Sequence, residues 1–259
     1  MIFVGLGLSG PDDMSLKALD ILKSSDEVFA EFYTSRLIDA SISELEARIG
    51  KEVKVLGRRE VEEGDTVIRA AERGRVAFVT AGDPMVATTH VDLRIRAAET
   101  GIGTRLIHGV SILTACAAAF GLQPYKFGRT VTLPFHEPGY VPSSPYEHIL
   151  ENRERGLHTL ILLDIREEGR FMTAAEGIRW LMDAESRIGK RLMANETVVC
   201  AGARIGSETE RIVAGYPETV ASADLGPPLH VLALPSKLHF LEARALVLFA
   251  GAPEEILRE

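Results

Sequence analysis

The chain has 259 residues, of which 46% are hydrophobic and 25% are charged, a composition that supports a full buried core and excludes a disordered chain. Its 37 acidic and 29 basic residues give a formal net charge of −8 at pH 7. Because a phosphate backbone requires a basic surface, this balance disfavours a nucleic-acid partner and favours a protein or a small molecule.

The first residues, 1–5, form an apolar run without a basic leader, so we expect a first strand rather than a signal peptide. No apolar stretch approaches the roughly 20 residues of a membrane-spanning helix. Cys116 and Cys200 stand among small or apolar neighbours, which is typical of reduced core thiols. The seven histidines show no metal-ligand spacing. We therefore expect a cytoplasmic protein without a membrane segment or a metal.

Short β-rich runs alternate with helical patterns through the first half of the chain. The runs cover residues 2–6, 27–32, 53–56, 76–80 and 104–107, and a helix is expected over 112–120. This alternation predicts a mostly parallel sheet with helices on its faces. The segment 121–124 (Gly-Leu-Gln-Pro) then suits a junction, so we expect domains 1–122 and 123–259.

The second half opens with a run at 130–133 and a loop that contains Pro134, Pro138, Pro142 and Pro145. Such a long loop is often functional. Further strands are expected at 159–165, 197–201 and 231–234, and helices at 174–184 and 240–249. The continuous apolar runs at 160–163 and 231–234 are typical of a sheet covered on both faces. The sequence therefore predicts a second α/β domain.

The first loop, residues 5–10, matches the dinucleotide pattern G-x-G-x-x-G. A dinucleotide loop leads directly into a helix whose N-terminus faces the pyrophosphate. Here residues 11–13 (Pro-Asp-Asp) delay the helix to about Met14 and put two carboxylates where phosphates would lie. The match is therefore weak. Glu27 and Glu31 nevertheless stand at about the distance along the chain at which an acidic residue binds the ribose in dinucleotide-binding folds, so a nicotinamide cofactor remains an alternative. A tight turn that requires glycine is the structural alternative.

A second loop follows the apolar run 76–80 with the turn Gly82-Asp83-Pro84. This turn ends the strand and places a carboxylate at its carboxyl edge, where ligands of open α/β sheets bind. A surface turn whose Asp83 caps the next helix is the simpler alternative.

Residues 82–90 as a whole resemble the Gly-Asp-Pro loop of the tetrapyrrole methylases, which transfer a methyl group from S-adenosylmethionine. Together with 30–35 upstream, they are similar to one branch of that family, the archaeal diphthine synthases. The likeness extends from residues 3–8 to 250–257, and 126–129 and 156–164 also resemble this branch. Residues 7–13 lack the Gly-Pro-Gly-Asp-type continuation of tetrapyrrole-modifying relatives, which disfavours a porphyrin-type substrate.

The resemblance implies two α/β domains with mostly parallel or mixed sheets flanked by helices, with S-adenosylmethionine in the interdomain cleft. It implies S-adenosylhomocysteine as product, no metal, and a homodimer. The cofactor contacts that it implies are Leu8, Asp83, Val86, Ser111, Ile112, Leu163, Ile205 and His230. Judged singly, Leu8, Ile112 and Leu163 are more often ordinary core residues, and a buried imidazole is a rival explanation for His230; their joint placement favours the cofactor site.

The implied reaction is repeated methylation of the amino group of the aminocarboxypropyl-modified histidine of elongation factor 2, which gives diphthine in diphthamide biosynthesis. The alternatives are a precorrin- or uroporphyrinogen-type tetrapyrrole C-methyltransferase and a non-catalytic nucleoside sensor. The catalytic base is unassigned, and Glu31, Tyr33, Asp83 and His90 are candidates by polarity alone. Tyr33 or Tyr125 could face the quaternary ammonium product.

Overall fold

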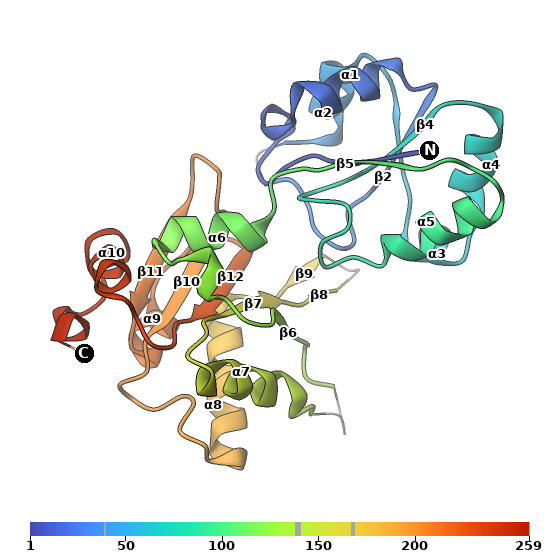
Figure 1. Ribbon diagram of the computed structural model, residues 1–259. Coiled ribbons are helices and arrows are strands. Elements are labelled where there is room, and N and C mark those ends of the chain that lie inside the picture. The colour runs from blue at the N-terminus through green and yellow to red at the C-terminus, as the bar shows by residue number, and fades with distance from the viewer. Residues whose placement is uncertain (39, 138–140, 167–168, 259) are drawn as a thin grey trace. The chain divides into compact units, whose positions relative to one another are not determined.

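The computed structural model describes residues 1–38, 40–137, 141–166 and 169–258. The chain forms two compact units, Met1–Ile112 and Leu113–Glu259 (Figure 1). The division falls directly after Ile112, the first residue of helix α6 (Ile112–Phe120), whereas the sequence suggested a boundary after the helix, at 122. The rest of the helix goes with the second unit because its Phe120 ring packs beside Gly202 of that unit, where a β-carbon would lie 3.3 Å from the ring and 2.7 Å from the Ile205 side chain.

The first unit contains a parallel sheet of five strands in the order β3-β2-β4-β1-β5. All five strands lie close to the predicted runs. They are β1 (Ile2–Gly5), β2 (Glu27–Glu31), β3 (Val53–Val55), β4 (Val76–Thr80) and β5 (Arg105–Ile107). Strands β1, β2 and β4 are buried almost throughout, whereas the shorter β3 and β5 each have one buried residue, Val53 and Ile107.

Helices cover both faces of this sheet (Figure 1). Helices α1 (Leu16–Ser24) and α2 (Ile42–Ile49) pack on one face, in a core with Val4, Val28 and Val79. Helices α3 (Arg58–Glu62), α4 (Thr66–Arg73) and α5 (His90–Glu99) pack on the other, in a core with Phe3, Phe29 and Phe78. The predicted helix-covered parallel sheet is confirmed.

The connections of this sheet reverse direction between β1 and β4. From β1 the chain passes beyond β4 to form β2, and from β4 it passes beyond β1 to form β5. The loops that leave β1 and β4 therefore diverge to opposite faces. In open α/β sheets, ligands bind in the crevice outside the carboxyl ends of the strands at such a switch point.

The second unit has a mixed sheet of five strands in the order β11-β10-β12-β7-β6. β6 and β7 are parallel, and the other neighbours are antiparallel. The strands are β6 (Val131–Leu133), β7 (Thr159–Leu163), β10 (Val199–Ala203), β11 (Arg211–Gly215) and β12 (His230–Leu234), and β8 (Ile165–Arg166) pairs separately with β9 (Arg170–Phe171). The predicted strand 159–165 is thus divided between β7 and β8.

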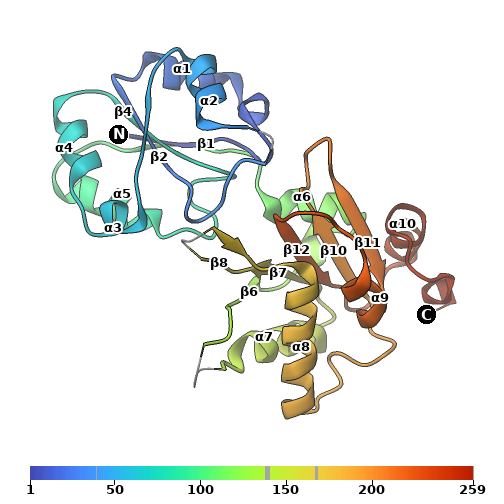
Figure 2. The same ribbon diagram turned by 180° about the vertical axis from the view of Figure 1, so that it is seen from behind.

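Helices also cover both faces of the second sheet (Figure 2). Helices α7 (Ser144–Glu154), α8 (Ala174–Ile188) and α9 (Pro217–Ser222) share one core with the sheet. Helices α6 and α10 (Phe240–Ala250) pack on the opposite face, where Cys116 and Cys200 are buried as free thiols. The 3₁₀ helices of the chain are η1 (Pro11–Asp13), η2 (Pro124–Lys126) and η3 (Glu254–Arg258).

The proline-rich segment is only partly the loop that the sequence suggested. Pro134 and Pro142 lie in the connection from β6 to α7, whereas Pro145 lies in the first turn of α7. Pro138 lies outside the described residues. None of the described helices combines the length and the apolar character needed to cross a membrane.

Candidate functional site

Three glycines meet at the carboxyl edge of the first sheet: Gly5 ends β1, Gly82 follows β4 and Gly109 follows β5. A β-carbon on Gly109 would collide with the carbonyl oxygen of Gly82 and lie 2.8 Å from the carbonyl carbon of Gly5. A β-carbon on Gly5 would lie 2.6 Å from the nitrogen of Gly109. The three loops therefore pack backbone against backbone at the switch point.

Replacing Gly109 with alanine should lower the free energy of unfolding by about 1 to 3 kcal/mol, because the added methyl group meets main chain that cannot move aside. Urea unfolding, followed by circular dichroism, measures the change. Gly103→Ala is the control, since a β-carbon there has no neighbour within 4 Å. Equal stability of the two variants would contradict this close packing.

The first loop is closed by a carboxylate of its own chain. Gly7 has a φ of +85° and exchanges two backbone hydrogen bonds with Gly82, of 3.3 and 2.6 Å. The Oδ2 atom of Asp13 accepts hydrogen bonds from the backbone N–H groups of Leu8 and Ser9, at 3.0 and 2.7 Å, and from the Ser9 hydroxyl at 2.9 Å. These N–H groups are the ones that a dinucleotide loop would present to pyrophosphate, so the geometry disfavours a nicotinamide cofactor. The following helix, α1, begins at Leu16, slightly later than predicted.

The Gly-Asp-Pro turn holds Asp83 between two partners. Its Oδ1 atom accepts the N–H of Met85 at 3.1 Å, and its Oδ2 atom lies 2.8 Å from Nδ1 of His108, which follows β5. The backbone N–H of Val86 donates to the Asp83 carbonyl at 3.2 Å. The N-cap of α5 is Thr89, so the interpretation of Asp83 as a helix cap is wrong.

His108 is a polar residue of this edge to which the sequence reasoning assigned no role. Its side chain is 71% exposed, so it is not a core histidine. The position of His108 directly before Gly109, at the end of a predicted strand, could have identified it as a residue of this site. Ser111 and Ile112 follow in the same segment and are half-buried.

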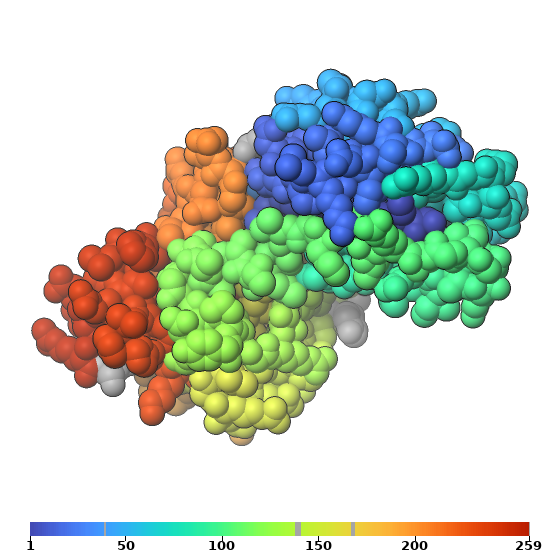
Figure 3. Space-filling view, turned by 45° about the horizontal axis from the view of Figure 1, so that its top comes forward, coloured from blue at the N-terminus to red at the C-terminus, as the bar shows by residue number. Residues whose placement is uncertain are grey.

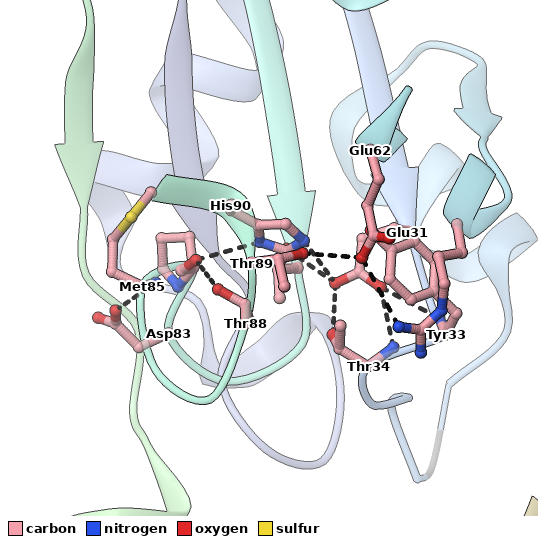
Figure 4. A network of polar contacts seen from close by, with 12 residues as sticks. Glu31, Tyr33, Thr34, Glu62, Asp83, Met85, Thr88, Thr89 and His90 are labelled. Carbon is pink, nitrogen blue, oxygen red and sulfur yellow. Dashed lines mark hydrogen bonds and ion pairs between the residues drawn. The ribbon is translucent and has the colours of Figure 1, made fainter. Parts of the chain in front are cut away.

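Glu31, Tyr33 and His90 form a buried polar network beside the turn (Figure 4). The Oε2 atom of Glu31 accepts the N–H groups of Tyr33 and Thr34, each at 3.0 Å. Burial lowers the pKa of His90, and burial together with the Glu31 carboxylate raises the pKa of Tyr33. All three side chains are buried, and the guanidinium of Arg58 lies 4.9 Å from the centre of the Tyr33 ring.

The three predicted contacts of the second half lie at one edge of the second sheet. Leu163 ends β7, His230 begins β12, and Ile205 follows the end of β10. Because β12 is antiparallel to both neighbours, with Ala203 opposite His230, these positions belong to the same edge. Leu163 and Ile205 are buried.

The hydrogen bonds of His230 show which of its ring nitrogens carries the proton. Its Nδ1 atom accepts the N–H of Ala174 at 3.1 Å, so Nε2 carries the proton and donates to the carbonyl of Gly226 at 3.2 Å. Burial lowers its pKa, and the Arg204 charge acts in the same direction. Arg204 is itself buried and donates to the carbonyls of Leu225, at 2.9 Å, and of Pro227. The sequence reasoning missed this arginine, because its partners include main-chain carbonyls of a loop that is distant in sequence, in addition to Thr209.

The predicted contacts thus form two sets at two strand edges. Leu8, Asp83, Val86, Ser111 and Ile112 belong to the carboxyl edge of the first sheet, and Leu163, Ile205 and His230 to one edge of the second. The first set offers one buried carboxylate, that of Asp83, together with the apolar side chains of Leu8, Val86 and Ile112, which suits a cation-bearing organic cofactor. Across the described ranges, no group of three or more His, Cys, Asp or Glu side chains is arranged to hold a metal ion.

Comparison with known proteins identifies the family. The family model of the tetrapyrrole (corrin/porphyrin) methylases matches residues 1–221. The chain belongs to this family. Its predicted fold, two α/β units with parallel and mixed sheets between helices, is therefore confirmed by both the structure and the family.

Individual methylases of this family are similar along their whole length. A diphthine synthase of Methanothermobacter thermautotrophicus is 46% identical over 258 residues, which cover 99% of this chain and 98% of the relative. A diphthine synthase of Methanoregula boonei is 49% identical over 252 residues, covering 97% and 99%. A crystal structure of a diphthine synthase superposes with a TM-score of 0.90 at 37% identity, covering 99% and 98%.

Proposed function

We propose that this methylase transfers methyl groups from S-adenosylmethionine to the amino group of the aminocarboxypropyl-modified histidine of elongation factor 2, repeatedly, to give diphthine in diphthamide biosynthesis. The observation that carries the proposal is the identity of 46% and 49% with two archaeal diphthine synthases over almost the full length of both partners. The Gly-Asp-Pro turn at the switch point supports the same assignment, because it puts a carboxylate where such sheets bind ligands.

In this proposal the cofactor contacts are the two sets of residues described above. The Asp83 carboxylate offsets the positive charge of the cofactor, which carries a sulfonium and an ammonium group. The apolar side chains of Leu8, Val86, Ile112, Leu163 and Ile205 exclude water from its methionine and adenine parts. The first loop suits a cofactor without phosphate, since Asp13 already occupies two of its N–H groups.

Bound S-adenosylmethionine would supply an activated methyl group, so the proposed transfer requires no metal. What the protein must contribute is position and desolvation: the acceptor amine has to present its lone pair in line with the bond that breaks. The close packing of Gly5, Gly82 and Gly109 gives the first-sheet loops a fixed backbone for this purpose. Glu31, Tyr33 and His90 are buried, which favours a supporting role over direct proton transfer to the acceptor.

The proposed partners are elongation factor 2 as a protein substrate and a second copy of the chain, with no nucleic acid and no membrane, in the cytoplasm. Exposed apolar side chains on one side of α10 support the homodimer: Leu241, Leu248 and Phe249 are 50%, 69% and 64% exposed. These residues belong to the red C-terminal segment in Figure 3. Exposed apolar patches of this kind are typical of protein interfaces.

A tetrapyrrole C-methyltransferase is the second candidate of the same family. It would need basic groups for the carboxylates of its substrate, whereas the chain has a net charge of −8. The two archaeal relatives described above are named diphthine synthases, which does not favour this candidate.

Mass spectrometry of an archaeal elongation factor 2 that carries the aminocarboxypropyl-histidine tests the proposal directly. Incubation with the protein and S-adenosylmethionine should add successive methyl masses to that residue, ending at the trimethyl form. The unmodified factor is the control and should gain none. Tight binding of S-adenosylhomocysteine without any mass gain would contradict this substrate, and binding of NAD instead would contradict the cofactor.

A further inference from the structure

The buried Glu31 and His90 side chains lie beside the Gly-Asp-Pro turn that carries part of the proposed cofactor site (Figure 4). Glu31 is the last residue of β2 and His90 the first of α5. Both side chains are fully buried, and Nε2 of His90 lies 3.4 Å from Oε1 of Glu31. Burying a carboxylate such as that of Glu31 is costly unless hydrogen bonds satisfy it. The hydrogen-bond partners of Glu31 and His90 therefore show which part of the fold the two side chains stabilise.

The other ring nitrogen of His90 contacts the Gly-Asp-Pro turn itself. Its Nδ1 atom lies 3.1 Å from the carbonyl oxygen of Pro84, the residue after Asp83. A carbonyl oxygen can only accept a hydrogen bond, so Nδ1 must carry a proton. The same oxygen accepts the hydroxyl of Thr88 at 2.8 Å. Both lone pairs of the Pro84 carbonyl are therefore engaged by side chains, and the orientation of this peptide is fixed.

Glu31 is itself bonded to the sheet and to the segment after β2. Its Oε1 atom accepts the hydroxyl groups of Thr34, at 2.5 Å, and of Thr80, at 3.2 Å, while Oε2 binds the backbone after β2. Thr80 is the last residue of β4. The Thr80 hydroxyl also lies 3.4 Å from Nδ1 of His90, so the contacts run from Glu31 through Thr80 and His90 to the Pro84 carbonyl of the turn that presents Asp83.

We infer that His90 is a positioning residue, whose Nδ1–H bond to the Pro84 carbonyl fixes the Gly-Asp-Pro turn in the geometry that binds S-adenosylmethionine. The inference rests on the proposed function, since it assigns this residue to the same cofactor site. His90 acts through the turn and does not touch the reacting atoms. Because Nδ1 carries the proton and burial lowers the pKa of His90, Nε2 is unprotonated and has no hydrogen-bond partner among the described residues, so the bond from Nδ1 and the close burial of the ring hold its orientation.

Two substitutions test the roles of the two ring nitrogens of His90 separately. The side-chain amide nitrogen of His90→Asn replaces Nδ1 and retains a donor for the Pro84 carbonyl, whereas the longer side chain of His90→Gln reaches the place of Nε2 and loses that donor. We expect His90→Asn to bind S-adenosylhomocysteine within about threefold of the wild type, and His90→Gln to bind about 10-fold or more weakly, since the lost bond is buried. Isothermal titration calorimetry measures both, and His148→Gln, on α7, is the matched histidine control.

Kinetics and stability distinguish positioning from a merely structural role. The KM for S-adenosylmethionine should rise for His90→Gln and be largely restored in His90→Asn, even if both variants lose similar thermal stability. Equal affinities of the two variants would overturn the inference. If either variant fails to fold, ¹⁵N-histidine spectra of the wild type decide the matter: an unprotonated Nδ1 of His90 would overturn the inference, and a protonated Nδ1 that shifts when S-adenosylhomocysteine is added would support it. Failure of the proposed function would differ, because the wild type itself would then not bind S-adenosylhomocysteine.

Discussion

Replacing Asp83 with alanine should weaken the binding of S-adenosylhomocysteine and of S-adenosylmethionine about 10- to 150-fold, which is the cost of losing a hydrogen bond or ion contact to a charged group. Asp83 is 7% exposed, so water cannot replace its carboxylate efficiently. The cofactor loses more than the product, because only the cofactor carries the sulfonium charge. Calorimetry of both ligands, together with the rate of methyl transfer, measures the effect.

The comparison that isolates the charge is Asp83→Asn. Asparagine keeps an oxygen for the N–H of Met85 and a side-chain partner for His108, and so preserves the turn. It should nevertheless weaken S-adenosylmethionine binding, by less than alanine does. Asp26→Ala is the matched control: this carboxylate also accepts a backbone N–H, from Arg75 at 2.7 Å, but it precedes β2 at the opposite edge of the sheet. Wild-type affinity in both Asp83 variants would refute the proposed cofactor contact.

Replacing Glu242 with glutamine should lower the free energy of unfolding of the second unit by about 3 to 5 kcal/mol, as expected when one partner of a buried ion pair is removed. Glu242 lies on α10 and is fully buried. Its carboxylate binds Nζ of Lys126, Nε2 of His158 at 3.0 Å, and the backbone N–H groups of Gln123 at 2.9 Å and His239 at 2.8 Å. Glutamine turns an NH₂ group toward these donors and leaves the lysine charge without a counterion.

Urea unfolding followed by the fluorescence of Trp180 reports on this unit, since Trp180 is the single tryptophan and is buried in its core. Glu176→Gln is the matched control: Glu176 occupies the same capping-box position on α8, and its side chain is 32% exposed. Its loss should cost about 1 kcal/mol or less. Similar losses in the two variants would contradict a special role of the buried carboxylate.

The effect of Glu242 should also depend on pH in a defined direction. Burial acts to raise its pKa, but Lys126 and the N–H donors outweigh burial and lower the pKa from 4.5 to about 2. A folded-state pKa below the unfolded value means that the stabilisation is complete above pH 4.5 and is lost as the pH falls toward about 2. The stability difference between wild type and Glu242→Gln should therefore shrink over this range.

The sequence predicted the first unit well because buried parallel strands are continuous apolar runs. Strand 76–80 occurs in the structure with the predicted bounds, as does helix 112–120 at the start of the second unit. In the second unit, the sequence reasoning missed β11, because this edge strand has one exposed and two half-buried residues, Arg211, Ile212 and Val213. It missed α7 because Pro145 was interpreted as part of a loop, although proline is well tolerated in the first turn of a helix.

The candidate site was less accessible to prediction than the fold. The Gly-Asp-Pro turn could be identified because its residues are adjacent in the chain. The contact of Glu31 with His90 could not, since it depends on β2 and β4 being neighbours in the sheet. The role of Arg204 was equally hidden, because its partners include main-chain carbonyls, which have no sequence signature.

The Asp13 carboxylate in the first loop has a consequence for selectivity in the cell. ATP and NAD are abundant competitors of any adenosine-containing cofactor, and their phosphates bind readily to the N–H groups of glycine-rich loops. Here an incoming phosphate would have to displace a carboxylate that already holds three hydrogen bonds from Leu8 and Ser9, and would lie beside its negative charge. Asp13 therefore disfavours the binding of nucleotides at this loop. The same edge of the sheet can still bind an adenosine compound that lacks phosphate.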